Sequence, residues 1–529
     1  VAIGDTALDS VEAGGINNVA IGDHAGTAIT TGDCNTAVGK DALDASTTAS
    51  YNTAIGFNSL TTNTSGNVNT AVGMGSAQQN TEGTNLVAVG ARALEQNTTG
   101  SCNTALGKNA LLCNTTASNN TAVGFESLCA NTTGSPNTAV GSCALLANTT
   151  GSNNTAIGYQ SLQSNTSGIR NTAIGHGTLN LNVSGQCNIA IGQVALNKNT
   201  ASNNTAIGIN AMEENTSGAN NVALGSQALK VNTTASGNTA VGTSALLDNV
   251  TGANSTAIGA NALENNTASN NVAVGSGSAY KTTSGENNTA VGTNSFKCNT
   301  TGTQNVAIGV DALKANTTAS NNVAVGDDSL VANTTGTSNI AVGQGAMNSN
   351  TTGSCNISIG HRSMDLNSTG SRNTAVGKDA MRCNTANDNT AYGFESLNCN
   401  STGIHNSAVG QALCKNTSGN CNVAMGSGAL SSNTTASDNV AVGRSALTAN
   451  TTGANNIAVG ARALCTVTTG IKNIAIGTEA LRYNTGSNNT AIGYLALDAN
   501  TTASSNTAVG ESALGANTTA NYNVAIGAN

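Results

Sequence analysis

The sequence predicts an all-β protein, a parallel β-solenoid of about 31 coils of about 17 residues. The phrase Asn-x-Ala-(Val/Ile)-Gly recurs from residue 4 to residue 527 with a spacing of 17 residues almost everywhere. Helical repeats need about 33 to 47 residues, so this period is too short for them. The phrase is rich in β-branched residues, as strands are. Asn, Gly, Thr and Ser separate its copies, as in turns that join strands.

The composition is unlike that of an ordinary globular chain. Of 529 residues, 2% are aromatic and 8% are charged, and Pro occurs once. A net charge of -8 with no basic patch argues against nucleic-acid binding. No apolar run approaches the roughly 20 residues that span a bilayer, so we expect no membrane insertion. We interpret residues 1–529 as one continuous array, a fragment of a longer protein or filament.

The strand is the first element of each repeat, as in "NNTAIGYQSLQSNTSGIRNTAIG" at residues 153–175. We number a repeat from its leading Asn, so Asn154 is position 1 and Arg170 is position 17. Because Thr, Val and Ile exchange at position 2, we expect positions 2, 4 and 9 inside the coil and position 3 outside. Each coil would hold two short strands and two turns. At about 4.8 Å per coil, the array would be a rod of roughly 150 Å.

Position 3 is Ala in every copy except Ser358. If this position points outward, a closely packed neighbour must exclude larger side chains. If the orientation is reversed, a bare ribbon of Thr, Val and Ile lies along the rod and marks an interface instead. Either orientation predicts lateral self-association as a homotrimer or fibre. The Ala interface ribbon is represented by Ala122, Ala139, Ala156 and Ala173.

The corner and the turn complete the repeat. Position 5 is always Gly, which indicates a tight corner with positive φ or close backbone approach. The turn repeats the Asn-x-Thr/Ser sequon and admits two interpretations. The Asn side chains either carry glycans or form a ladder that satisfies turn backbone groups. Candidate glycosylation sites are Asn97, Asn131, Asn148, Asn333 and Asn450.

Thirteen cysteines fall at variable positions in or beside the turns, without a C-x-x-C motif. In-register coils would place equivalent Cα atoms about 4.8 Å apart, within disulfide range. Cys383 and Cys399 share one turn position of adjacent repeats, and we predict a disulfide between them. The alternative is that all are scattered surface thiols.

The runs "NNTAIG" at residues 153–158 and "NIAIG" at residues 473–477 resemble head repeats of YadA-like trimeric autotransporter adhesins. The longer form NTAIGxxALxxNTTG resembles repeats in phage and virus tail-fibre proteins that precede an endosialidase-type chaperone domain. The resemblance implies a left-handed parallel β-roll, usually trimeric, that is extracellular on a cell or virion surface.

No catalytic set is visible. The four histidines lie on different repeats without paired carboxylates, and the Ca²⁺-binding nonapeptide is absent. We therefore expect neither an enzyme nor a cofactor or metal site. We predict a structural fibre or adhesin-type stalk for surface attachment or filament assembly, whose partners are copies of itself, lateral or head-to-tail, and a host-surface receptor. The alternative is a repetitive ligand-binding surface that binds ice or glycans.

Overall fold

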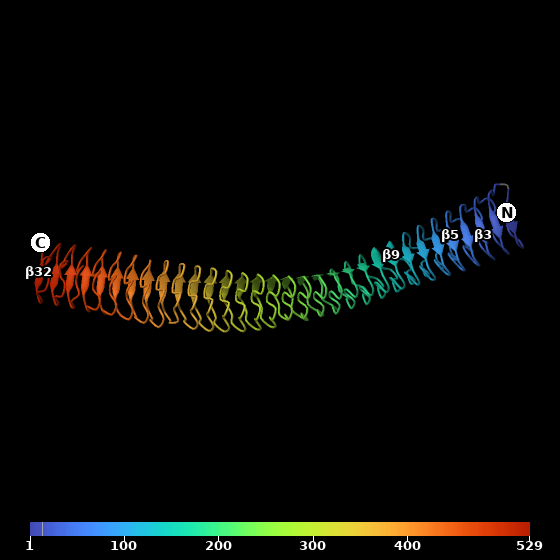
Figure 1. The fold of residues 1–529 in the computed structure, drawn as a ribbon. Helices are drawn as coiled ribbons and strands as arrows, with labels where there is room; N and C mark the ends of the chain where they lie inside the picture. Colours follow the sequence, from blue (N-terminus) through green and yellow to red (C-terminus); the bar gives the residue numbers. More distant parts are fainter. Residues whose placement is uncertain (13, 529) are drawn as a thin grey trace. The chain divides into compact units, whose positions relative to one another are not determined.

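The computed structural model describes residues 1–12 and 14–528 and confirms an all-β, parallel β-solenoid. The chain divides into two compact units, Val1–Ser269 and Asn270–Asn529. Each unit contains sixteen of the strands assigned in the described residues, and no helix is assigned there. Within each unit the strands stack in the order of the sequence (Figure 1).

The strands of the first unit are short and regularly spaced. They are β1 (Ala2–Ile3), β2 (Val19–Ile21), β3 (Thr36–Val38), β4 (Thr53–Ile55), β5 (Thr70–Val72), β6 (Val87–Val89), β7 (Thr104–Leu106), β8 (Thr121–Val123), β9 (Asn137–Val140), β10 (Asn154–Ile157), β11 (Thr172–Ile174), β12 (Ile189–Ile191), β13 (Thr205–Ile207), β14 (Val222–Leu224), β15 (Thr239–Val241) and β16 (Thr256–Ile258).

The strands of the second unit follow the same pattern. They are β17 (Val272–Val274), β18 (Thr289–Val291), β19 (Val306–Ile308), β20 (Val323–Val325), β21 (Ile340–Val342), β22 (Ile357–Ile359), β23 (Thr374–Val376), β24 (Thr390–Tyr392), β25 (Ser407–Val409), β26 (Val423–Met425), β27 (Val440–Val442), β28 (Ile457–Val459), β29 (Ile474–Ile476), β30 (Thr490–Ile492), β31 (Thr507–Val509) and β32 (Val524–Ile526).

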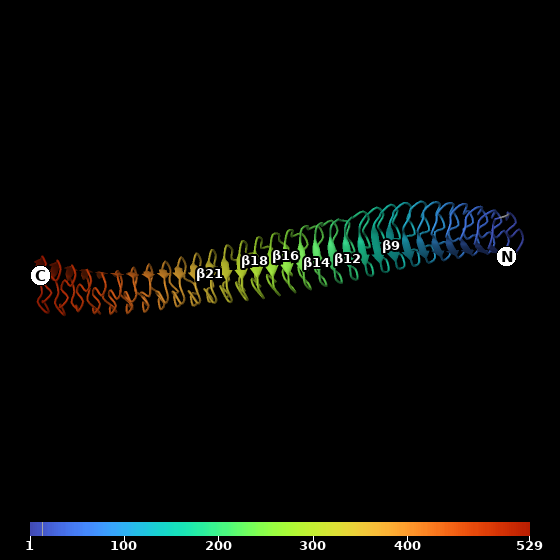
Figure 2. The ribbon, with the colours of Figure 1, turned by 90° about the horizontal axis from the view of Figure 1, so that it is seen from above.

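Neighbouring strands pair in parallel with equivalent residues side by side. Thr155 of β10 pairs with Thr172 of β11, and Ala156 pairs with Ala173. Seen from above, the strands of each unit form a row with the connecting loops beside it (Figure 2). Backbone hydrogen bonds between coils continue into the loops, as where Leu162 N–H donates to the Thr178 oxygen at 2.9 Å. The period therefore matches like residues around the whole coil.

Each complete coil has one strand of three or four residues, so the prediction of two strands per coil is wrong. The reason lies in the backbone beyond the strand. Positions 7, 9 and 17 are left-handed, with φ of 54° at Gln160, 51° at Leu162 and 56° at Arg170. Left-handed residues interrupt extended backbone, and each costs roughly 1–2 kcal/mol for a non-glycine residue. The burial of Leu162 favours this conformation, and its predicted inward position is confirmed.

The predicted orientation of the strand is wrong, and so is the Ala interface ribbon. The alanines at position 3 point into the coil, and Ala122, Ala139, Ala156 and Ala173 are all fully buried. Positions 2 and 4 face outward instead, with Ile157 39% exposed. Alternation along a strand places positions 1 and 3 on the same face, and the Asn at position 1 is needed inside for hydrogen bonding.

The narrowness of the interior explains why position 3 stays small. In the one coil with Ser at this position, Ser358 Oγ donates to the Ser363 backbone oxygen at 2.8 Å across the coil. Ser363 is at position 8, where Ala, Ser and Thr alternate, and its Oγ reaches the Ala375 oxygen of the next coil at 3.2 Å. Positions 3 and 8 therefore lie in direct contact. Small residues are required by the fold of one chain, without a neighbouring molecule.

The corner at position 5 is built as the sequence predicts. Gly158 has φ of 132°, a conformation that L side chains rarely adopt. A Cβ added there would overlap with the carbonyl oxygen of Gly175 in the next coil. Stacked corners thus approach too closely for any residue other than Gly.

Candidate functional site

The Asn residues at position 12 form a buried ladder along the turn. Asn165 Nδ2 donates to Asn148 Oδ1 at 2.8 Å and to the Gly168 oxygen at 3.1 Å, and Asn182 Nδ2 donates to Asn165 Oδ1 at 2.9 Å. The side chain thus links three coils and satisfies a turn carbonyl. Of the two interpretations of the sequon, the ladder is the one that the structure shows.

The five candidate glycosylation sites belong to this ladder, so the prediction that they carry glycans is wrong for the folded chain. All five are fully buried, and each Nδ2 donates to the Asn of the preceding coil. A glycan needs that nitrogen on the surface, where the folded chain does not present it. The residues for which glycosylation was predicted are Asn97, Asn131, Asn148, Asn333 and Asn450.

A second Asn ladder occupies position 1. Asn154 Nδ2 donates to the Gly168 oxygen in the turn of its own coil at 2.9 Å. Its Oδ1 accepts from Asn171 N–H of the next coil at 3.0 Å. Sequence reasoning missed this ladder, although its signal was present: a solvated position would not be Asn in nearly every repeat. Both ladders hydrogen-bond polar groups that burial would otherwise leave unsatisfied.

All thirteen cysteines are free thiols in the structure. Cys383 N–H donates to the Asn398 oxygen of the next coil at 2.9 Å, beside Cys399. Burial raises the pKa of the Cys383 thiol, and the nearby Cys399 raises it further. The two cysteines lie in adjacent coils as predicted, but no bond joins their sulfur atoms, and their disulfide stays a prediction.

Charged side chains gather at the corners and pair between coils. Arg372 Nε lies 2.7 Å from Asp388 Oδ1, and Lys198 Nζ lies 2.6 Å from Glu214 Oε2. Such exposed pairs contribute about 0–1 kcal/mol each. They lie outside the strands, and none of the strands assigned in the described residues contains a charged residue.

The outward face of the strands is therefore an uncharged surface. We call it the strand face and define it as positions 2 and 4 of each coil. Its columns hold mainly Thr, Val and Ile, and several members are substantially exposed. Examples are Val87 at 36%, Val222 at 39%, Leu224 at 45% and Val423 at 40%.

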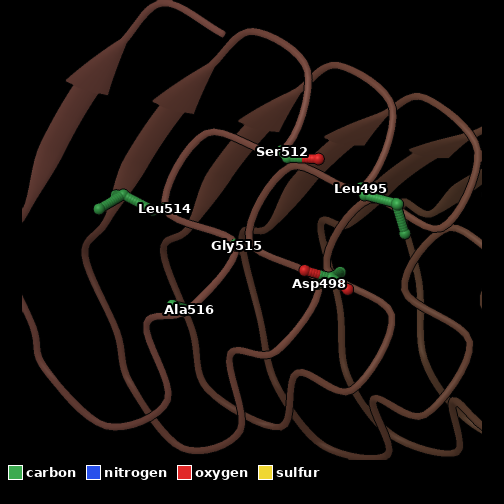
Figure 3. Close-up of a pocket in the computed structure, with 6 residues that line it drawn as sticks. All are labelled: Leu495, Asp498, Ser512, Leu514, Gly515 and Ala516. Atoms are coloured by element: carbon green, nitrogen blue, oxygen red, sulfur yellow. The ribbon is translucent and has the colours of Figure 1, made fainter. Parts of the chain in front are cut away.

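A surface hollow of about 460 Å³ lies in the last coils of the second unit (Figure 3). Leu495 and Asp498 line it from one coil, and Ser512, Leu514 and Gly515 line it from the next. It exists because Gly515 places no side chain beside Asp498. Among the described residues that line it, Asp498 is the one carboxylate, and no His or Cys accompanies it or the Ser512 hydroxyl.

Within residues 1–12 and 14–528, no group of three or more His, Cys, Asp or Glu side chains is arranged to hold a metal ion. Over the same described part of the chain, no helix has the length and apolar character needed to cross a membrane. Neither a model of a known protein family nor a curated protein matches this sequence.

Proposed function

We propose that this chain is a structural, non-catalytic element of an extracellular fibre or adhesin-type stalk whose copies associate through the strand face. The observation that supports this proposal is the strand face itself, which is uncharged in every described strand and carries Val, Ile or Leu at position 4 of most coils. Large exposed apolar patches on a protein surface mark interaction sites. The surface placement of the fibre, on a cell or virion, follows from the resemblance to adhesin and tail-fibre repeats.

The size of the face supports a stable contact. Sixteen strands in one unit, at about 4.8 Å each, give a face about 70 Å long and about 10 Å wide. This area of about 700 Å² is close to the roughly 800 Å² that each partner contributes to a standard interface. A second copy of the chain is the natural occupant, since its face has the same length, spacing and chemistry.

Light scattering of the full chain tests this proposal. Lys at Ile157, Ile174 and Ile191 places three charges on position 4 of consecutive coils, where outward side chains accept them without entering the interior. We expect the wild type to have a multiple of its 51.8 kDa mass and the triple variant to dissociate. A wild-type mass of 51.8 kDa at tens of micromolar would refute the proposal.

A matched control separates the face from charge in general. Thr150, Ser167 and Ser184 are exposed at position 14 of the same region, away from the strands. Lys at these three positions adds the same charge, and we expect the assembly to persist. Dissociation of both triple variants would locate the effect in net charge and not in the strand face.

Ice binding by the same face is the second candidate. The outward column at position 2 has five consecutive Thr residues in register, from β7 to β11. Such a regular hydroxyl array at about 4.8 Å spacing favours an ordered ligand. Thermal hysteresis of the wild type would support this candidate, and its absence at millimolar protein would exclude it.

A further inference from the structure

A hollow of about 230 Å³ lies in the first unit, at the corner that follows the strands. Its centre is Gly75, at position 7 of its coil, with φ of 66°. A Cβ there would lie 3.4 Å from Gln78 Oε1 and 3.8 Å from Arg92 Cγ, so the missing side chain leaves the space open. The surrounding side chains come from three consecutive coils and are Phe57, Asn58, Met74, Gln78, Arg92 and Glu95.

One wall of the hollow is apolar and exposed. Phe57 is 48% exposed and Met74 is 53% exposed, at position 6 of adjacent coils. Exposed aromatic side chains recur at position 6, as at Phe125 and Phe394, and at this hollow the exposed Met74 of the next coil lies beside Phe57. Apolar side chains of this size gain from being covered, and the open hollow provides room for a ring-sized group above them.

The other wall carries hydrogen-bonding groups. Arg92 Nε donates to Glu95 Oε2 at 2.6 Å, so the two charges cancel and hold each other in place. Glu95 Oε1 and the terminal guanidinium nitrogens of Arg92 make no hydrogen bond within the described residues, and neither do the side-chain amides of Asn58 and Gln78. The hollow therefore offers both donors and acceptors without a net charge.

The second unit contains an equivalent hollow of about 150 Å³ that serves as an internal comparison. It is also centred on a position-7 glycine, Gly345, and an Arg and an acid follow in the next coil, at Arg362 and Asp365. Its other walls are polar. Gln344 takes the place of Met74, and Asp328 takes the place of Asn58. The two hollows share the glycine at position 7 and differ in the apolar wall. They also differ in their ion pairs, because Arg362 lies 3.2 Å from Asp379 and Asp365 lies 3.5 Å from Arg382, both in the following coil.

We propose that the Gly75 hollow binds a neutral pyranose unit of a polysaccharide. A pyranose has an apolar face of C–H groups that covers Phe57 and Met74. It also has a rim of hydroxyls that donate to Glu95 and accept from Arg92 and the two amides. The charge-neutral polar wall disfavours an ionic ligand, because neither charge of the pair is free to compensate it. This site is independent of self-association through the strand face.

Saturation-transfer NMR on the full chain tests this site with cellohexaose, laminarihexaose and maltohexaose as separate probes. A ligand of this size on an open surface binds with a Kd on the order of 1 mM, which the method detects. Gly75→Asn fills the hollow without backbone change, because Asn occupies position 7 with φ of 58° at Asn58 and at Asn109. Phe57→Ser removes the apolar wall, and Ser is already the position-6 residue at Ser142.

We expect saturation transfer from the wild type to at least one probe, and a reduction of at least tenfold in both variants. Gly345→Asn fills the equivalent hollow that lacks the apolar wall, and we expect it to retain the wild-type signal. Circular dichroism verifies that each variant keeps the β-fold. Absence of transfer to all three sugars would overturn the proposal. Transfer that survives in both Gly75→Asn and Phe57→Ser would overturn it equally, because the sugar would then bind elsewhere.

Discussion

The position-12 ladder makes a sharp prediction at Asn165. Among the described residues, replacing it by Ala removes the one hydrogen-bond donor to Asn148 Oδ1 and leaves Asn182 Nδ2 with its bond to the Gly185 oxygen alone. The Gly168 oxygen keeps one partner, because Asn154 Nδ2 also donates to it. One orphaned buried acceptor, one weakened donor and a small cavity together cost about 2–4 kcal/mol. Asn165→Asp costs more, because a carboxylate placed against Asn148 Oδ1 repels it and donates nothing.

Hydrogen exchange of the full chain is the appropriate assay, because coils of a solenoid contact only their neighbours and open locally. We expect amides of the coils around Asn165 to exchange about 30- to 700-fold faster in Asn165→Ala, since 1.4 kcal/mol is a factor of ten. Coils near residues 36–72 should be unchanged. Ser167→Ala, an exposed change in the same turn, should stay within about threefold of the wild type. Exchange in Asn165→Ala that matches this control would refute the buried ladder.

Three further predictions address the corner, the interior and the thiols. Gly158→Ala forces a methyl group onto the Gly175 carbonyl oxygen and should cost more than about 3 kcal/mol, measured by the same local exchange; wild-type protection would contradict the corner geometry. Ala156→Val overfills the contact between positions 3 and 8 and should lower the free energy of unfolding by about 1–3 kcal/mol. Thr155→Val, on the outward side of the strand, should change it by less than about 0.5 kcal/mol. A larger loss for Thr155→Val than for Ala156→Val in urea unfolding would mean that position 3 points outward. Burial, with the neighbouring Cys113, raises the pKa of Cys129 to about 11, so this thiol stays protonated at pH 8. Its alkylation should be about 100-fold slower than that of a thiol with the ordinary pKa of 9.0 and should accelerate up to about pH 11, which peptide mass spectrometry measures; fast alkylation at pH 8 would contradict its burial.

The period, the parallel stacking and the corner glycine followed from the sequence because each is a repeat-wide constraint. A 17-residue spacing leaves room for one small coil. Gly at every corner indicates directly that the backbones of adjacent coils approach closely there. The orientation of the strand did not follow, because alternation shows which residues share a face but not which face is inside. Thr155 and Ile157 are larger and more apolar than Ala156, so hydrophobicity alone placed them inward. The interior is instead narrow, which the Ser358–Ser363 hydrogen bond shows.

The candidate sites depended on the same ambiguity. A buried Asn ladder and a surface sequon have the same local sequence at Asn148, and only the position of the side chain distinguishes them. The hollow at Gly75 needed three coils in register, since Phe57 and Arg92 are 35 residues apart in sequence. A glycine at the otherwise variable position 7 was its one signal in the sequence.

Photo-cross-linking tests most directly whether the strand face is where copies of this chain meet. Benzoylphenylalanine in place of Ile157 lies on the strand face, and in place of Ser167 it lies on the exposed turn of the same coil. We predict that irradiation of the 157 protein yields covalent dimers of twice the 51.8 kDa chain mass, and that the 167 protein stays monomeric in the denaturing gel. Equal yields from both positions, or no dimer from position 157, would contradict association through the strand face.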